Sequence, residues 1–424
     1  MVAEPATLLS FEEARRIVED HASSLRPKGR ELLGLLDASG RVLAQAIHAD
    51  RDFPPFPRAA RDGYAVRTAD LENLPADLEV IGEIKAGAAP EHIPAITPGK
   101  AAAIMTGAAA PAGADAVVMV EYTARAGDRV EITRGVAAGD NIVPPGSEAK
   151  RGERLLAPGA RVSYGEIALA AAVGRPRLLV YSKPRIAVLS TGDEVVDVDV
   201  PPEPNQIRNS NSYSLAAQIQ AAGGEAVLLP IAPDEPGRLR ELLQEGLEAD
   251  LLLIAGGVSL GKYDLVEPVL VEMKAEFFFT GAKIQPGKPI VFGRVPWPAD
   301  ACDREAHSKT SQYKNFFGLP GNPTSTMVTF ELFARPMLEA LAGMGVRKLA
   351  FLHAKLKTAI KTKIGLKRFL PASLTGEFES AEVELVRWQG SGDIPAVTRA
   401  NCYVVIPPER ERIEAGEWVS VLLR

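Results

Sequence analysis

The sequence predicts a multidomain protein of the α/β class. Its 424 residues are enough for roughly two to four domains. Between about residues 185 and 340, strand-like apolar runs alternate with helical patterns, as is typical of a doubly wound parallel sheet. On both sides of this region, short β-like runs are separated by Gly and Pro turns. We therefore expect an α/β domain, a small β-rich lobe and a compact C-terminal β-barrel or sandwich.

Two helical segments predict an N-terminal and linking lobe. Ser10 and Glu13 have the spacing of a capping box, and apolar residues then recur at helical intervals to about residue 25. A second helix is expected over 163–174, between a serine cap and a glycine stop. We assign residues 1–50 and 146–180 to one discontinuous lobe that contains both helices.

The residues between these two segments, 51–145, are predicted to form the β-rich lobe. Its entry, 51–62, carries closely spaced prolines, which stiffen the chain and exclude a helix. Turns then separate several short β-like runs, and this pattern predicts strands. The runs are Leu78–Ile81, Ala101–Met105, Ala116–Val120 and Val130–Thr133.

The α/β domain is assigned to residues 181–342. Within it, Asp234 is expected to be the N-cap of one helix, and Asp264 could cap a short helix that follows a buried strand. A final strand leads into a long helix over 324–340. Sheets of this kind bind ligands outside the carboxyl ends of their strands, so those ends are where a site is expected.

Two further segments complete the predicted organisation. Residues 294–314 are polar and aperiodic, and we interpret them as a surface insertion between two strands. Residues 343–424 alternate in polarity and are predicted to form the C-terminal β domain.

The composition excludes several classes of protein. The net charge of −6 argues against a dedicated nucleic-acid binder. The apolar runs are too short for a membrane helix, and the N-terminus does not have the pattern of a signal peptide. Cys302 and Cys402 lie outside any CxxC motif, and the histidines lack metal-ligand spacing. A cytoplasmic protein without a membrane or nucleic-acid partner is expected.

Four loops stand where a predicted strand gives way to a helix or turn: 190–194, 232–236, 256–264 and 318–325. Taken singly, each is explained by an ordinary turn or a helix cap. Taken together, they bring several acidic side chains and glycine-rich backbone to one rim of the sheet. The acidic residues are Asp193, Glu194, Asp234 and Asp264.

This combination predicts a phosphate-containing ligand bound with Mg²⁺. Gly-rich loops at helix N-termini offer backbone N–H groups to phosphate, whereas carboxylates would repel it unless a divalent cation lay between them. Lys288, between a glycine and a proline, is a plausible cation for an oxyanion, although a lone surface lysine is the default explanation. The chain has neither a Walker motif nor a GxGxxG, so a P-loop NTPase and a dinucleotide dehydrogenase are not supported.

The segments RDGYAV, IMTGAAAP, STGDEV, RNSNSYSL, GGVSLGKYD, QPGKPIVFG and GLPGNPTS occur in the order seen in one family. The chain resembles the MoeA proteins and the gephyrin E domain, which are molybdopterin molybdenumtransferases, from about residue 8 to 422. The resemblance implies insertion of molybdate into adenylylated molybdopterin with Mg²⁺-dependent release of AMP. It also implies an elongated homodimer with four lobes per chain, a molybdopterin-binding α/β domain, and a site completed by the partner subunit.

The resemblance also implies roles for individual residues. Asp62 and Thr106 would reach in from the partner subunit, and Glu194, Asp234 and Asp264 would position Mg²⁺ and the reacting groups. The expected substrate-binding residues are Gly256, Gly257, Ser259, Lys288, Pro320, Gly321, Asn322, Pro323, Ser325, Arg368 and Ser391.

Two positions depart from the family pattern. Gln285 stands where some relatives carry lysine, so one cation of the oxyanion site is missing or is supplied elsewhere, with Lys283 as the candidate. Glu148 stands where the family often has Asp, which keeps the charge and lengthens its reach.

Two other functions remain open at this stage. The chain could be a molybdopterin adenylyltransferase, although its length and the RDGYAV segment argue against that. It could also be a non-catalytic dimeric scaffold of the gephyrin E-domain type. The adenylyltransferase and the enzymes that accept the cofactor are further candidate partners. The sequence does not distinguish molybdate from tungstate.

Overall fold

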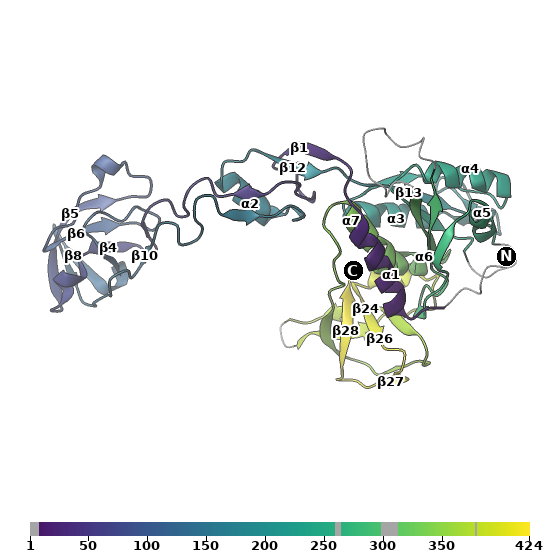
Figure 1. Cartoon of the computed structure of the whole chain (residues 1–424). Coiled ribbons are helices and arrows are strands. Elements are labelled where there is room, and N and C mark those ends of the chain that lie inside the picture. Colours follow the sequence, from purple (N-terminus) through teal and green to yellow (C-terminus); the bar gives the residue numbers. More distant parts are fainter. Residues whose placement is uncertain (1–7, 259–263, 298–312, 378–379) are drawn as a thin grey trace.

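A computed structural model of the protein describes residues 8–258, 264–297, 313–377 and 380–424. The chain is elongated, as expected. A β-rich lobe at one end is joined by a narrow connecting region to a larger part that holds the α/β sheet and the C-terminal barrel (Figure 1). Within the described ranges, no helix is both long and apolar enough to cross a bilayer.

The β-rich lobe is built on a six-stranded sheet in the order β7-β4-β6-β5-β9-β8. All four predicted β-like runs are strands in it. Alternate side chains of β4 enter different apolar clusters, Tyr64 on one face and Ala65 on the other, so both faces of the sheet are covered. The strands are β4 (Gly63–Val66), β5 (Ala76–Ile84), β6 (Lys100–Ile104), β7 (Ala116–Met119), β8 (Thr123–Ala126) and β9 (Arg129–Ile132). Short 3-10 turns lie at Thr68–Leu71, Pro90–His92 and Val120–Tyr122.

The connecting region is formed by two stretches of chain that run side by side. Strand β1 (Arg30–Gly34) pairs antiparallel with β12 (Arg177–Tyr181), and helix α2 (Tyr164–Ala172) starts at its predicted serine cap. Two shorter antiparallel pairs continue the contact toward the β-rich lobe. They are β2 (Ile47–His48) with β11 (Arg154–Leu156), and β3 (Arg58–Ala59) with β10 (Ile142–Val143).

The α/β sheet has six strands in the order β16-β13-β17-β21-β20-β18. The first four are mutually parallel, as predicted, but β20 runs antiparallel to both of its neighbours. No crossover helix precedes or follows β20 in the described chain, and a parallel connection needs one. The strands are β13 (Arg185–Ser190), β16 (Glu225–Leu228), β17 (Leu251–Ala255), β18 (Glu276–Phe279), β20 (Val291–Pro296) and β21 (Tyr313–Leu319).

The predicted insertion at 294–314 is therefore partly wrong. Arg294–Pro296 belong to β20 and pair with Tyr313–Asn315 of β21, so the ends of this segment extend a strand pair. The rest of the insertion, 298–312, lies outside the described residues.

The helices of this domain begin and end near their predicted positions, but two predicted caps are wrong. Glu235, not Asp234, is the N-cap of α4, and Leu265, not Asp264, is the N-cap of α5. Neither residue makes a side-chain cap bond. In α4 the proline at the first helical position has no N–H to be capped. The helices are α3 (Ser210–Ala221), α4 (Pro236–Gly246) and α5 (Val266–Glu272). A short parallel pair, β14 (Val195–Val196) with β15 (Ile207–Arg208), precedes α3.

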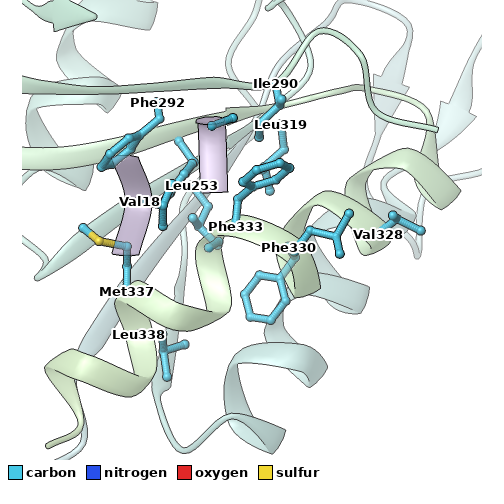
Figure 2. Close-up of a cluster of buried hydrophobic side chains, with 14 of the residues drawn as sticks. Val18, Leu253, Ile290, Phe292, Leu319, Val328, Phe330, Phe333, Met337 and Leu338 are labelled. Carbon is cyan, nitrogen blue, oxygen red and sulfur yellow. The ribbon is translucent and has the colours of Figure 1, made fainter. Parts of the chain in front are cut away.

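The long C-terminal helix of this domain is continuous but contains a π-helical segment. It consists of α6 (Pro323–Thr329), the π segment Phe330–Ala334 and α7 (Arg335–Leu341). Its apolar face packs on the sheet, and Phe333 and Met337 belong to the same buried cluster as Phe292 of β20 (Figure 2).

Helix α1 (Phe11–Ser24), which the sequence assigns to the linking lobe, packs onto this part of the molecule. Its capping box is present, with the Glu13 N–H donating to Ser10 Oγ at 3.2 Å. Its buried side chains, Val18 among them, join the cluster formed by the α/β sheet and α7 (Figure 2). The predicted domain bounds remain a proposal.

The C-terminal region is a closed barrel rather than a sandwich. Strands β24-β25-β22-β28-β26 follow one another, and β24 also pairs with β26, which closes the ring. Strand β19 (Ile284–Gln285) extends β24 from the α/β side. The barrel comprises β22 (Leu352–Leu356), β24 (Lys367–Thr375), β25 (Glu382–Leu385), β26 (Cys402–Ile406) and β28 (Trp418–Leu423), with α8 (Ile394–Arg399) and the pair β23 (Ile360–Lys361) and β27 (Arg412–Ile413).

Candidate active site

The predicted loops come together at the carboxyl ends of β13, β17 and β21, which are neighbours in the sheet. The Thr191 N–H donates to the Ala255 carbonyl at 3.2 Å, and the Gly256 N–H donates to the Leu319 carbonyl at 3.1 Å. Thr191 also forms a parallel bridge with Ala232, at the start of the loop that carries Asp234. Backbone pairing therefore fixes the loops to one another along this rim.

The acidic side chains of the rim influence one another. The Asp234 N–H donates to Asp193 Oδ1 at 3.0 Å. Burial raises the pKa of Asp234 above its ordinary value, and the negative charges of Asp193, Glu194 and Asp264 raise it further. A carboxyl surrounded by like charges favours a cation at this point. Among the described residues, however, no three metal-ligating side chains are already arranged as a metal site.

Gly256 and Gly257 are required first by the packing of the rim itself. Both have positive φ angles, +101° and +64°. A Cβ atom on Gly257 would lie 2.8 Å from Thr191 Oγ1 and 2.7 Å from Val266 Cγ2. The two glycines therefore let the loop close over Thr191, in addition to any role in the approach of a ligand. Ser259, the other predicted residue of this loop, lies outside the described residues.

The GLPGNPTS loop is held by hydrogen bonds within and around it. The Thr326 hydroxyl donates to the Pro320 carbonyl, and the Thr326 N–H donates to the Asn322 carbonyl at 3.0 Å. Asn211 Nδ2 donates to the Gly321 carbonyl at 2.7 Å, which ties α3 to the loop. Pro323 opens α6, and Ser325 is buried in its first turn.

A second group of predicted residues meets where the α/β domain joins the barrel. Arg368, only 7% exposed, donates from Nε to Gln285 Oε1 at 2.8 Å, and burial lowers the pKa of its guanidinium. The Thr324 N–H donates to the Ser391 carbonyl at 3.0 Å, which fixes the barrel loop to α6. Gly287, next to Lys288, packs against the first turns of the same helix. Arg368, Lys288, Ser325 and Ser391 are thus carried by adjoining segments.

Lys283 and Glu148 are the residues named where the sequence departs from the family pattern. Both have contacts with residues outside the predicted site. The Lys283 N–H donates to the Leu9 carbonyl at 2.7 Å. The pKa of Glu13 is lowered first by the Ser10 hydroxyl and, to a smaller extent, by the positive charge of Lys283. Glu148 forms an ion pair with Arg58 at 3.0 Å.

Asp62 and Thr106 contact each other, but not the rim of their own chain. Thr106 donates to Asp62 Oδ1 from its N–H at 2.6 Å and from its hydroxyl at 2.7 Å. These two hydrogen bonds lower the pKa of Asp62. Both residues flank strands of the β-rich lobe, β4 and β6, which lie at the far end of the molecule from β13 and α4 (Figure 1).

Two residues at the rim do not stand out in the sequence. The Thr191 hydroxyl and the Asn211 side-chain oxygen are buried and have no hydrogen-bond partner among the described residues. Both lie inside motifs that the sequence does single out, STGDE and RNSNSYSL. In the sequence, Thr191 is only a polar residue two positions before an acidic one, and Asn211 is only a polar residue in the first turn of a helix. Ordinary loops and helix starts show both patterns.

Comparison with known proteins covers almost the whole described chain. Residues 9–174 match the MoeA N-terminal region (domain I and II), 187–340 a probable molybdopterin-binding domain, and 353–423 the MoeA C-terminal region (domain IV). A molybdopterin molybdenumtransferase of a Nostoc species is 34% identical over 92% of this chain and 88% of its own length. The chain belongs to the MoeA family.

Other comparisons agree with this assignment to the MoeA family. A molybdopterin molybdenumtransferase of Bacillus subtilis is 32% identical over 93% of this chain and 89% of its own length. The crystal structure of a MoeA protein from Pyrococcus horikoshii OT3 is 27% identical, covers 99% of this chain and all of its own, and has a TM-score of 0.75. The resemblance and fold class predicted from the sequence are therefore confirmed.

Proposed function

We propose that the protein is a molybdopterin molybdenumtransferase that inserts molybdate into the dithiolene of adenylylated molybdopterin and releases AMP. The observation that carries this proposal is the convergence of glycine-rich loops and carboxylates at one sheet rim, beside a corner that holds Arg368 and Ser391. The names of the relatives support the reaction class. We expect the reaction to take place in the cytoplasm.

Glu194, Asp234 and Asp264 would hold a Mg²⁺ ion at the rim. The raised pKa of Asp234 indicates clustered negative charge, which a bound cation would stabilise. Phosphate oxygens of the substrate would complete a ligand set that the described side chains do not form alone. When bound, Mg²⁺ neutralises phosphate charge and stabilises the charge that develops on the leaving AMP.

The remaining residues bind and orient the substrates. The loop of Gly256 and Gly257, with Pro320, Gly321, Asn322 and Pro323, would contact the nucleotide and pterin portions. The Arg368 guanidinium, with Lys288, Ser325 and Ser391, would hold molybdate beside the dithiolene sulfurs, where proximity supplies much of the rate. Because Gln285 is neutral and accepts from Arg368, it orients that guanidinium without adding charge.

Asp62 and Thr106 would complete the site from a second subunit. Within one chain, both residues lie in the lobe farthest from the rim (Figure 1). A role in the reaction therefore requires a homodimer in which the β-rich lobe of one subunit reaches the rim of the other. Its hydrogen bonds to Thr106 lower the pKa of Asp62, so this carboxylate is negatively charged at neutral pH, as an ordinary aspartate also is.

The test is insertion in a purified system with adenylylated molybdopterin, molybdate and Mg²⁺, read out as cofactor formation and AMP release. Asp264→Asn should fold normally and lower the rate at least about a hundredfold. Full activity of this variant would refute the role of Asp264. An unsubstituted protein that forms dimers but neither inserts molybdenum nor releases AMP would point to the scaffold function, and ATP-dependent adenylylation would point to the adenylyltransferase.

A further inference from the structure

An open surface cavity of about 1010 Å³ lies at the loop between β25 and α8 of the barrel region. Arg387, Gln389, Ser391, Asp393 and Arg399 contribute to its lining. The volume is far larger than a single tetrahedral oxyanion needs and is suited to a ligand of nucleotide size. Of the lining residues, only Ser391 has been assigned to the proposed site above.

The lining of this cavity carries two arginines and one carboxylate. The one acidic lining residue, Asp393, uses both carboxylate oxygens internally, accepting from Ala396 N–H and from Gln389 N–H at 3.0 Å each. Among the described residues, neither Arg387 nor Arg399 has a carboxylate partner, and Arg399 donates only to the Arg387 carbonyl at 3.2 Å. Two arginines against one carboxylate leave the lining of the cavity with a net positive charge.

Two other arginines at the barrel surface have carboxylate partners, whereas Arg424 donates to the Val397 and Ala400 carbonyls. Arg410 is paired with Glu417 at 2.7 Å, and Arg412 is paired with Glu414 at 2.6 Å. Like Arg424, Arg387 and Arg399 have no carboxylate partner among the described residues, but they are the arginines that line the cavity.

The position and the backbone of the loop also favour a ligand. Ser391 and Asp393 carbonyls accept from the N–H and hydroxyl of Thr324, so the cavity wall is fixed to the GLPGNPTS loop of the α/β domain. Gly390, with a φ angle of +136°, brings bare backbone to the cavity wall. Beside it, the indole N–H of Trp388 is buried and has no acceptor in the described part of the chain.

We propose that Arg387 and Arg399 form a subsite for a phosphate ester of the ligand, reached from the corner that holds Ser391. The planar guanidinium groups match two oxygens of a phosphate, which a lysine does not do. This inference rests on the proposed function, because it assigns the cavity to the phosphate-bearing end of a molybdopterin or nucleotide substrate. Free molybdate would bind at the buried Arg368 instead.

The experiment measures AMP and molybdate binding by calorimetry on the full-length protein and on Arg387→Ala/Arg399→Ala. The matched control is Arg410→Ala, which removes one exposed arginine from the same barrel. In the double variant AMP affinity should fall about a hundredfold, or about tenfold per charged hydrogen-bonding group, and its salt dependence should become weaker. Molybdate affinity and the thermal midpoint should not change, and the control should bind both ligands normally.

Three results would overturn the proposal. They are unchanged AMP affinity in the double variant, an equal loss of AMP and molybdate affinity, and absence of AMP binding to the unsubstituted protein at millimolar concentration. Arg387→Lys/Arg399→Lys, which keeps the charge but loses the planar fork, should recover only part of the AMP affinity. Failure of the proposed function is seen separately, as absence of molybdenum insertion by the unsubstituted protein.

Discussion

The Arg368 guanidinium donates from Nε to the side-chain oxygen of Gln285 across 2.8 Å, at the seam between β24 and β19. Because Arg368 is 7% exposed, its charge is held in a poorly solvated place, and burial lowers its pKa. A neutral hydrogen-bond acceptor at position 285 thus fixes the orientation of the arginine while leaving its charge available to an anion.

The charge at position 285 should therefore control oxyanion binding. Gln285→Lys adds a second cation beside Arg368, which should lower the free energy of unfolding by about 1–2 kcal/mol but strengthen molybdate binding. Gln285→Glu should pair with Arg368, and molybdate binding should fall about tenfold or more. The measurement is the molybdate-induced rise in the thermal midpoint, together with KM for molybdate. The assignment would be contradicted if the affinity for molybdate did not fall in the order Lys, Gln, Glu at position 285.

The clustered carboxylates of the rim should make stability depend on pH. Because the pKa of Asp234 is raised, the folded protein holds this proton more tightly than the unfolded chain does, so ionised Asp234 opposes folding at neutral pH. Asp234→Asn should raise the thermal midpoint by about 1 °C at pH 7 without Mg²⁺. This gain should shrink as pH falls through the raised pKa, and it should vanish below the ordinary value of 3.8.

Magnesium should reverse the order of the thermal midpoints of Asp234→Asn and the unsubstituted protein. If the rim binds the cation, Mg²⁺ will raise the midpoint of the unsubstituted protein more than that of Asp234→Asn. Glu235→Gln, which removes the neighbouring exposed carboxylate, is the control and should respond to Mg²⁺ normally. Equal Mg²⁺ responses of Asp234→Asn and the unsubstituted protein would remove Asp234 from the metal site.

The features that are predicted correctly depend on short-range signals. The capping box of Ser10 and Glu13, the strand runs of the β-rich lobe and the loops at strand ends follow from a few neighbouring residues. The features that are wrong depend on tertiary context. The direction of β20 follows from what connects it to its neighbours, and Asp234 and Asp264 each stand one residue before the N-cap that the sequence assigns to them.

The site shows the same division. Motifs identify the loops, but the reason for Gly257 appears only when Thr191 and Val266 are packed against it. Thr191 and Asn211 could not have been chosen from the sequence. They are distinguished only by a buried side-chain oxygen that has no hydrogen-bond partner among the described residues. Nor could the sequence separate Arg387 and Arg399 from the paired arginines of the barrel.

The packing of Gly257 predicts a larger loss of stability than its backbone angle alone would cause. Gly127 has the same φ angle, +64°, and a Cβ atom added there would have no neighbour within 4 Å, whereas one on Gly257 would meet Thr191 Oγ1 at 2.8 Å. Gly127→Ala should cost about 1 kcal/mol of unfolding free energy, and Gly257→Ala about 1–3 kcal/mol more. Denaturant unfolding of both variants checks this difference.

Removing part of the neighbour should restore some of that loss. Thr191→Ala combined with Gly257→Ala should be more stable than the sum of the two single changes implies, because the clash with Oγ1 is gone. Equal costs for Gly127→Ala and Gly257→Ala would mean that the loop relaxes freely and that the packing argument fails.

The separation of Asp62 from the rim of its own chain leads to a test of the shared site. If each site takes Asp264 from one subunit and Asp62 from the other, Asp62→Asn and Asp264→Asn homodimers will each be inactive. A mixed dimer will contain one site with both substitutions and one with neither. Random mixing makes half of the dimers mixed, each with one intact site of two, so co-expression should recover about one quarter of full activity.

Three comparisons make this result specific. Asp62→Asn mixed with Glu194→Asn should also recover activity, since Glu194 belongs to the rim. Glu194→Asn mixed with Asp264→Asn should not, because every dimer then lacks one rim carboxylate in each site. Tagged purification of the mixed dimer should raise recovery to about one half. Two results would show that the site is not divided between subunits in this way. One is recovery of activity when the two rim variants are mixed, and the other is no recovery when Asp62→Asn is mixed with either rim variant.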